Sequence, residues 1–118
     1  MTIHPFPRHR IATLDDLPRP SDENACWLVA FHIARCVYMV EQESLRKQQP
    51  DYEPRQMAVV VAENIGIPRK VVCEYFNVAD SIITKWQMEF SVKCANDPAF
   101  RDKVQWISGS CRTNTGRR

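Results

Sequence analysis

Residues 72–86, which read VCEYFNVADSIITKW, constrain the fold more than any other part of this chain. Val72, Cys73 and Phe76 stand at i, i+1 and i+4, a spacing that places three apolar side chains on one face of a short helix. Ile83 and Trp86, at i and i+3, form a second apolar face further along. The sequence therefore predicts two short helices whose apolar faces pack on each other.

The segment between these helices has the chemistry of a tight turn. Asn77 stands where the chain must reverse with a positive φ, a conformation that Gly adopts easily and Asn tolerates. Val78 fills the corner, and either Asp80, a good N-cap residue, or Ala79 starts the second helix. The face of that helix directed away from the core carries Asp80, Ser81, Thr84 and Lys85. This arrangement is typical of a helix-turn-helix, whose second helix enters a DNA major groove, although it also occurs in helical bundles that touch no DNA.

The segment before residue 54 predicts one long helix. Ser21 is placed as its N-cap, and residues 22 and 23 are acidic, as the positive end of a helix dipole favours. From residue 25 to residue 40 the helix is apolar almost all round, which is too wide a stripe for one small core. Either this is the central helix, wrapped by all the others, or part of it pairs with the same helix of a second chain. In the second case we expect a homodimer with an interface of Trp27, Phe31 and Tyr38.

Two helices are predicted after the polar connector of residues 42–53. Pro54 suits the first turn of a helix over residues 54–65, and Gly66 is placed to end it. Its apolar stripe is Met57, Val60 or Val61, and Ile65. Pro68 opens the next helix, which runs to residue 76 and is the first of the pair described above.

Two longer helices follow. The first runs from residue 80 to about residue 93, with Trp86 and Phe90 facing inward. Asp97 is placed as N-cap and Pro98 as first residue of the last helix, whose inner stripe is Phe100, Val104 and Ile107. The tail after Gly109 lacks apolar periodicity and is expected to fray. We therefore expect an all-α fold of about five helices and no strand.

The chain divides into four parts by composition and charge. Residues 1–20 are a Pro- and Arg-containing flexible arm, residues 21–53 the long apolar helix and its connector, residues 54–107 the helix-turn-helix region, and residues 108–118 a basic flexible tail. The net charge is only +2, and the basic excess is at the two ends. Because duplex binders gain most non-specific affinity from Lys and Arg on phosphates, we expect weak binding by one copy, helped by the tails or by oligomerisation.

Several classes of function find no support. The five cysteines include no C-x-x-C pair, which argues against a zinc site or a disulfide framework, and we expect four of them to be small buried hydrophobes. His32 and Cys36 share a helix face, but no third ligand or orienting carboxylate accompanies them. Three glycines form no phosphate-binding loop. We expect no enzyme activity, cofactor or metal, no membrane contact and a cytoplasmic location. Two of the three tryptophans fall on predicted inner faces, which favours core positions over stacking platforms for single-stranded bases.

Residues 54–107, just under half of the chain, resemble a known family. They carry Pro54-Arg55-Gln56-Met57-Ala58, then Ala62-Glu63, then the predicted helix-turn-helix, then Asp97-Pro98-Ala99-Phe100. This order is similar to that of the C-terminal DNA-binding domain of the bacterial replication initiator DnaA, which has a Trp-repressor-like all-helical fold. The resemblance implies that Arg55 reaches the minor groove and that the residues after the turn read bases in the major groove. Asp80 matches the family's signature after the turn, whereas Ala79 stands where the family has Arg.

These observations together predict a DNA-binding protein of regulatory or replication-related role, without the initiator's nucleotide-binding module. The expected partner is double-stranded DNA, bound with some sequence preference by Arg55, Gln56, Arg69, Lys70, Asp80, Ser81, Thr84 and Lys85. The competing prediction is an all-helical protein-interaction module that kept the fold but lost DNA binding. Ala79 and the near-neutral charge favour that alternative, and the Pro-Arg-Gln string, Lys85 and the basic tails favour DNA.

Overall fold

The regular structure of the described residues is entirely helical. A computed structural model describes residues 22–116, so the predicted arm, the N-cap at Ser21 and the last two arginines lie outside the described part. The elements are α1 (Asp22–Phe31), a π-helical segment η3 (His32–Tyr38), a 3-10 helix η4 (Gln42–Arg46), α2 (Glu53–Asn64), α3 (Arg69–Phe76), α4 (Asp80–Asn96) and α5 (Pro98–Thr115). Five α-helices and no strand in residues 22–116 confirm the predicted all-α class.

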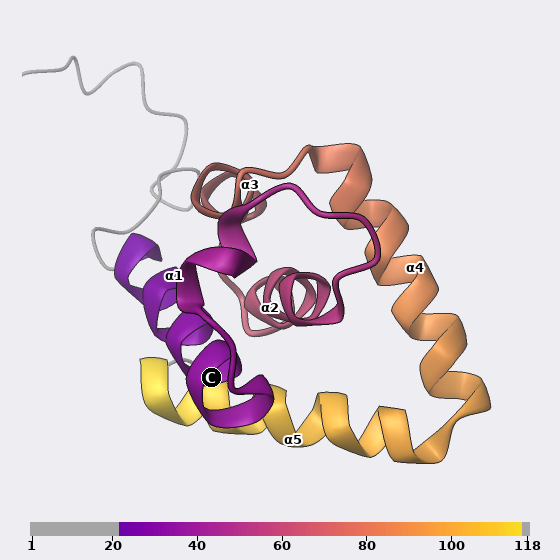
Figure 1. The fold of residues 1–118 in the computed structure, drawn as a ribbon. Coiled ribbons are helices and arrows are strands. Elements are labelled where there is room, and N and C mark those ends of the chain that lie inside the picture. The colour runs from indigo at the N-terminus through magenta and orange to yellow at the C-terminus, as the bar shows by residue number, and fades with distance from the viewer. Residues whose placement is uncertain (1–21, 117–118) are drawn as a thin grey trace, which may run out of the picture.

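The central element of the fold is α2. Figure 1 shows it near the middle of the molecule with α1, α3, α4 and α5 around it, and it packs against each of them and against η3 and η4. Residues 57–62, which read MAVVVA, are buried on every side, as expected of a helix that is apolar all round. The alternative that residues 25–40 form the central helix is therefore wrong.

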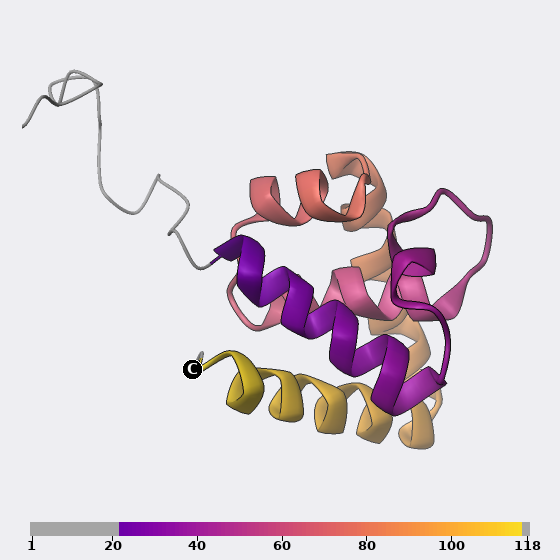
Figure 2. The ribbon, with the colours of Figure 1, turned by 60° about the vertical axis from the view of Figure 1, so that its left-hand side comes forward.

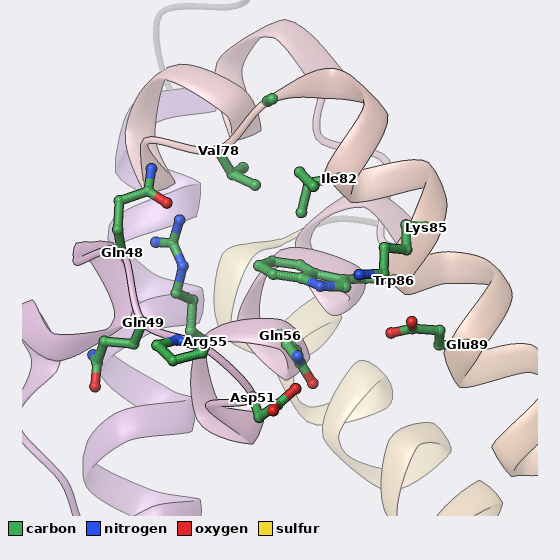
Figure 3. Close-up of a pocket in the computed structure, with 12 residues that line it drawn as sticks. Gln48, Gln49, Asp51, Arg55, Gln56, Val78, Ile82, Lys85, Trp86 and Glu89 are labelled. Carbon is green, nitrogen blue, oxygen red and sulfur yellow. The ribbon is translucent and has the colours of Figure 1, made fainter.

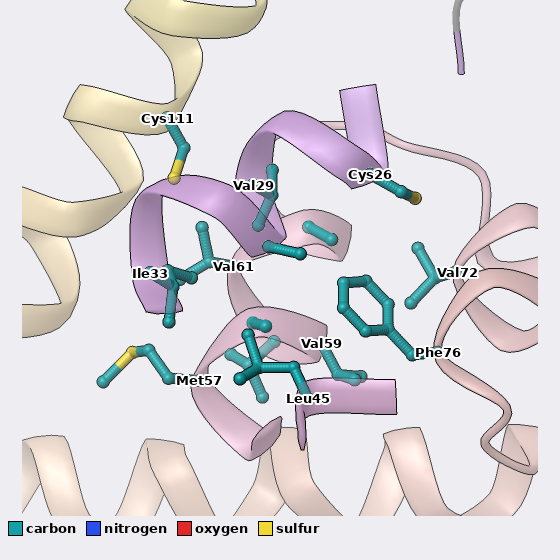
Figure 4. Packing of buried hydrophobic residues seen from close by; sticks show 14 of the residues in the cluster. Cys26, Val29, Ile33, Leu45, Met57, Val59, Val61, Val72, Phe76 and Cys111 are labelled. Carbon is teal, nitrogen blue, oxygen red and sulfur yellow. The ribbon is translucent and has the colours of Figure 1, made fainter. Parts of the chain in front are cut away.

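The predicted long helix over residues 25–40 has two parts. It is α-helical to Phe31 and π-helical from His32 to Tyr38, and it ends at Met39, whose left-handed backbone (φ 57°) directs its N–H to the carbonyl of Ala34. One side packs into the core through Val29 and Ile33 (Figure 4), whereas the opposite side of α1 faces solvent. Only the inner stripe of this helix is covered by the described chain, and the solvent side of α1 carries the large apolar side chains Trp27 and Phe31.

The turn between α3 and α4 has the predicted geometry. Asn77 has φ 56° and ψ 54°, and the N–H of Val78 reaches back to the carbonyl of Cys73 at 3.0 Å. Val78 is buried beneath the turn, and the inward residues Ile83 and Trp86 of α4 are buried as well. Of the two expected start positions, Ala79 is the N-cap and residue 80 is the first helical residue.

The last helix is longer than predicted. Asp97 caps α5 by accepting the N–H of Phe100 at 3.2 Å, as its position before Pro98 indicates. The helix then continues to Thr115, so the prediction that the chain frays after Gly109 is wrong. Cys111 extends the inner stripe by one more turn, and it is fully buried and directed toward α1 (Figure 4). The two helices α1 and α5 pack side by side (Figure 2). None of the helices in residues 22–116 is long and apolar enough to cross a lipid bilayer.

Candidate nucleic-acid interface

The first two turns of α4 present a polar face to solvent. The side chains that lie exposed there are Asp80, Ser81, Thr84 and Lys85, and Lys70 of α3 is also exposed. Within residues 22–116, no salt bridge or side-chain hydrogen bond engages Ser81, Lys70 or Lys85. These three side chains are therefore available to a ligand.

Arg69 fixes one edge of this face. Its guanidinium lies against the Glu63 carboxylate at 2.5 and 3.0 Å, and it also donates to Thr84 Oγ1 at 2.7 Å and to Asp80 at 3.3 Å. The hydrogen bond from Arg69 lowers the pKa of Glu63; burial opposes this shift, and a hydrogen bond from Gln87 adds to it. The structure thus brings three predicted contact residues together, but it uses Arg69 to join α2, α3 and α4.

Arg55 does not lie on this surface. It is 2% exposed, and its guanidinium donates to the backbone carbonyls of Leu45 at 2.9 Å, Phe76 at 2.6 Å and Asn77 at 3.0 Å. Burial lowers the pKa of Arg55 from its ordinary value. The expectation that Arg55 is an exposed side chain reaching a minor groove is therefore wrong for this structure, because η4 and the α3–α4 turn close over it.

A cavity of about 350 Å³ lies between the connector at residues 48–51 and the start of α4. Figure 3 shows Arg55 rising from α2 toward the turn that carries Val78, with Trp86 extending from α4 across the same space. Gln56 and Lys85 line the cavity too, so the predicted residues Arg55, Gln56 and Lys85 do lie close together. Asp51 and Glu89 also line it, which leaves the cavity without a cationic excess.

Sequence reasoning missed the part played by Glu63 and Gln87. Gln87 Nε2 donates to Glu63 at 2.7 Å, so the two side chains link α2 to α4 beside Arg69. Opposite charges on either side of the Gly66–Pro68 turn, at residues 63 and 69, were the available signal. Such a pair flanking a short turn is well placed to meet.

Fewer tryptophans and cysteines are buried than the sequence predicts. Of the three tryptophans, Trp86 is buried, whereas Trp27 and Trp106 are exposed. The five cysteines are free, and they range from buried Cys26 and Cys111 through intermediate Cys73 and Cys94 to exposed Cys36. Tyr38, predicted at a dimer interface, is half-buried, and its hydroxyl donates to Glu53. No group of three or more potential metal ligands occurs in the described residues.

Comparison of the chain with protein-family models, with curated proteins and with solved structures finds no match.

Proposed function

We propose that the chain binds double-stranded DNA, with α3 and α4 acting as a helix-turn-helix. The observation that carries this proposal is the start of α4, where Ser81 and Lys85 are exposed directly after a tight turn with positive φ at Asn77. A helix that begins in this way and presents short polar side chains has the shape and chemistry to enter a major groove. Lys70, on the adjoining helix, is placed to meet the phosphate backbone.

In this proposal the chain shares the major-groove contact of the DnaA domain and lacks the minor-groove contact. Arg55 stabilises the turn from inside and contacts no base, since its donors are directed to carbonyls of η4 and the α3–α4 turn. Ser81 and Lys85 read base edges, and Arg69 holds Thr84 and Asp80 in fixed positions beside them. The sequence resemblance to that domain supports a regulatory or replication-related role for such binding.

Selection from random duplex DNA tests the proposal. We expect enrichment of a short sequence, and we expect Lys85→Ala and Ser81→Ala to weaken binding to it, by about 1–3 kcal/mol for Lys85 if it touches a base. Arg101→Ala, on the exposed side of α5 where Arg101 pairs with its neighbour Asp102, is the matched control and should bind as the wild type does. Absence of any enriched sequence, together with unchanged binding by Lys85→Ala, would exclude this use of α4.

A protein-interaction module is the second candidate, favoured by exposed apolar side chains on the C-terminal half of α4. Met88 and Val92 stand one turn apart and are both well exposed, and with Glu89 and Lys93 they border an open depression of about 430 Å³. Exposed apolar clusters of this kind mark protein contacts. Under this alternative, duplex DNA binds equally at all sequences, and Lys85→Ala has no more effect on it than the control Arg101→Ala.

A further inference from the structure

A regular stripe of four exposed side chains runs along α1 and into η3. Glu23, Trp27, Phe31 and Arg35 follow one another at intervals of four residues, and all four are exposed. Trp27 and Phe31 are 46% and 42% exposed, and their rings stack on each other with centroids 5.5 Å apart and planes within 9°. Two large aromatic rings thus stack on each other at the surface, and both remain well exposed in the described part of the chain.

The backbone keeps this stripe on one side of the helix. In an α-helix, every fourth residue lies past a full turn by about 40°, so a stripe of this spacing slowly winds around the axis. The π-helical turn that begins at His32 has more residues per turn, and it therefore moves Arg35 back toward the line of Trp27 and Phe31. The stripe is about 18 Å long at 1.5 Å per residue.

Charge divides the stripe into two unlike ends. Glu23 lies at the start of α1 and Arg35 lies in η3, with the stacked rings between them. Neither Glu23 nor Arg35 makes a salt bridge within the described part of the chain. An acidic end, an aromatic centre and a basic end make the surface complementary to itself when it is turned end for end.

We propose that this stripe binds a second copy of the chain in an antiparallel, two-fold arrangement. In that arrangement Glu23 meets the partner's Arg35 at each end, and Trp27 packs on the partner's Phe31 in the middle. A parallel arrangement opposes like charges at both ends, which is unfavourable. Two-fold symmetry uses the same surface on both copies, so a single self-complementary stripe is sufficient.

This surface is independent of the proposed DNA interface. The helices α1 and α4 lie on opposite sides of α2 (Figure 1) and do not pack on each other. Self-association along α1 therefore leaves the start of α4 open. The interface also differs from the one predicted from the sequence, because Tyr38 is turned toward Glu53 and Lys103 and is no part of the stripe.

Sedimentation of the full chain over a range of concentrations tests the proposal. The wild type should form dimers that dissociate on dilution. Glu23→Lys and Arg35→Glu should each weaken the dimer roughly tenfold, because each variant opposes like charges at both ends. An equimolar mixture of Glu23→Lys and Arg35→Glu should dimerise again, since every end then pairs opposite charges in an antiparallel heterodimer.

Two further variants separate the stripe from general effects of charge and folding. Glu74→Lys and Arg101→Glu reverse charges at exposed sites on α3 and α5 and should leave the dimer unchanged. Phe31→Asp should give a folded, helical monomer, because Phe31 is exposed and contributes little to the core. A wild-type monomer at high micromolar concentration overturns the proposal. If the wild type dimerises but the mixture of Glu23→Lys and Arg35→Glu stays monomeric, the antiparallel pairing is overturned.

Discussion

At the scale of single residues, Arg55 shows how a cation is stabilised in an interior without a carboxylate. Three backbone carbonyls accept from its guanidinium, two of them at the carboxyl end of α3, where the helix dipole is negative. The ring of Trp86 lies 5.8 Å away and adds a weaker contact. Arg55 therefore joins η4, α2 and the α3–α4 turn from the inside.

Local sequence does not distinguish a buried Arg55 from an exposed one. The Pro-Arg-Gln string gives the start of a helix in either case, and that part of the prediction is confirmed by α2. Whether the side chain meets solvent depends on Leu45 and Asn77, which lie 10 and 22 residues away and supply two of its acceptors. Such distant partners leave no periodic pattern around residue 55.

Replacement of Arg55 is expected to destabilise the fold. Arg55→Ala leaves three carbonyls without their donor and opens a space beneath the turn, and we expect a loss of about 3 kcal/mol in the free energy of unfolding. Arg55→Lys should lose less, because an ammonium group can still reach some of the carbonyls. Urea unfolding followed by circular dichroism measures both losses.

The control for this series is Arg112→Ala, near the end of α5, where Arg112 makes no salt bridge within residues 22–116. It should change stability by no more than about 0.5 kcal/mol. An Arg55→Ala protein as stable as this control would mean that water replaces the guanidinium at no cost.

At the scale of elements, capping chemistry predicted where helices begin, and burial explains why α5 extends further than predicted. Pro54 and the Asp97-Pro98 pair start α2 and α5 as their residue types indicate. The end of α5 was missed because Cys111 is a single apolar residue in a polar sequence, and only its packing against α1 shows that it belongs to the core. The break at Phe31 was missed for a similar reason, since a π turn has no propensity signal of its own.

The α3–α4 turn depends on the left-handed backbone of Asn77. Asn77→Ala should cost about 1 kcal/mol, because a Cβ without a polar partner disfavours φ 56°, whereas Asn77→Gly should stay within about 0.5 kcal/mol of the wild type. Thermal unfolding of the two variants side by side gives the difference. Equal stabilities would show that the turn is held by the hydrogen bonds to its carbonyl from Arg55 and Gln48, and that its conformation adds nothing.

The ion pair of Glu63 with Arg69, which joins α2, α3 and α4, makes the free energy of unfolding depend on pH. The hydrogen bond from Arg69, which outweighs the opposing effect of burial, and the one from Gln87 hold the pKa of Glu63 below its ordinary value of 4.5. The stabilisation is therefore complete above pH 4.5, and it is lost as pH falls through the lower pKa of the folded state. Glu63→Gln should reduce the stability near neutral pH and flatten its decline in acid.

Glu74→Gln is the matched control for Glu63→Gln, because Glu74 is exposed on α3 and makes no salt bridge within the described residues. The urea midpoints of Glu74→Gln, measured above and below pH 4.5, should equal those of the wild type. If the stability of Glu63→Gln declines in acid as much as that of this control, the charge of Glu63 does not contribute to the packing of α2, α3 and α4 through Arg69.

At the scale of the whole molecule, α2 is an apolar central helix, and salt bridges at both of its ends connect it to the helices around it. Glu53 at its start pairs with Lys103 of α5 at 3.1 Å and Lys93 of α4 at 3.6 Å, and Glu63 near its end pairs with Arg69 of α3. These pairs use cations that are then less available to a ligand. Among the exposed cations of the described residues that form no salt bridge or side-chain hydrogen bond are Lys70 and Lys85 beside the start of α4, and Lys47, whose neighbour Gln48 donates to the carbonyl of Asn77.

Such a charge distribution predicts a shallow dependence of DNA affinity on salt. Each phosphate contact adds about −0.9 to the slope of log affinity against log salt, so Lys70, the lysine proposed to meet the phosphate backbone, accounts for a slope of about −1 for one copy. Lys70→Ala should weaken binding to every duplex alike and reduce the slope by about one, as removal of a phosphate contact does. Lys85→Ala should weaken the selected sequence more than a scrambled one. Titration of labelled duplexes at several salt concentrations measures both effects, with Arg101→Ala as control. A slope that Lys70→Ala leaves unchanged would place the phosphate contacts away from α3 and contradict the proposed docking.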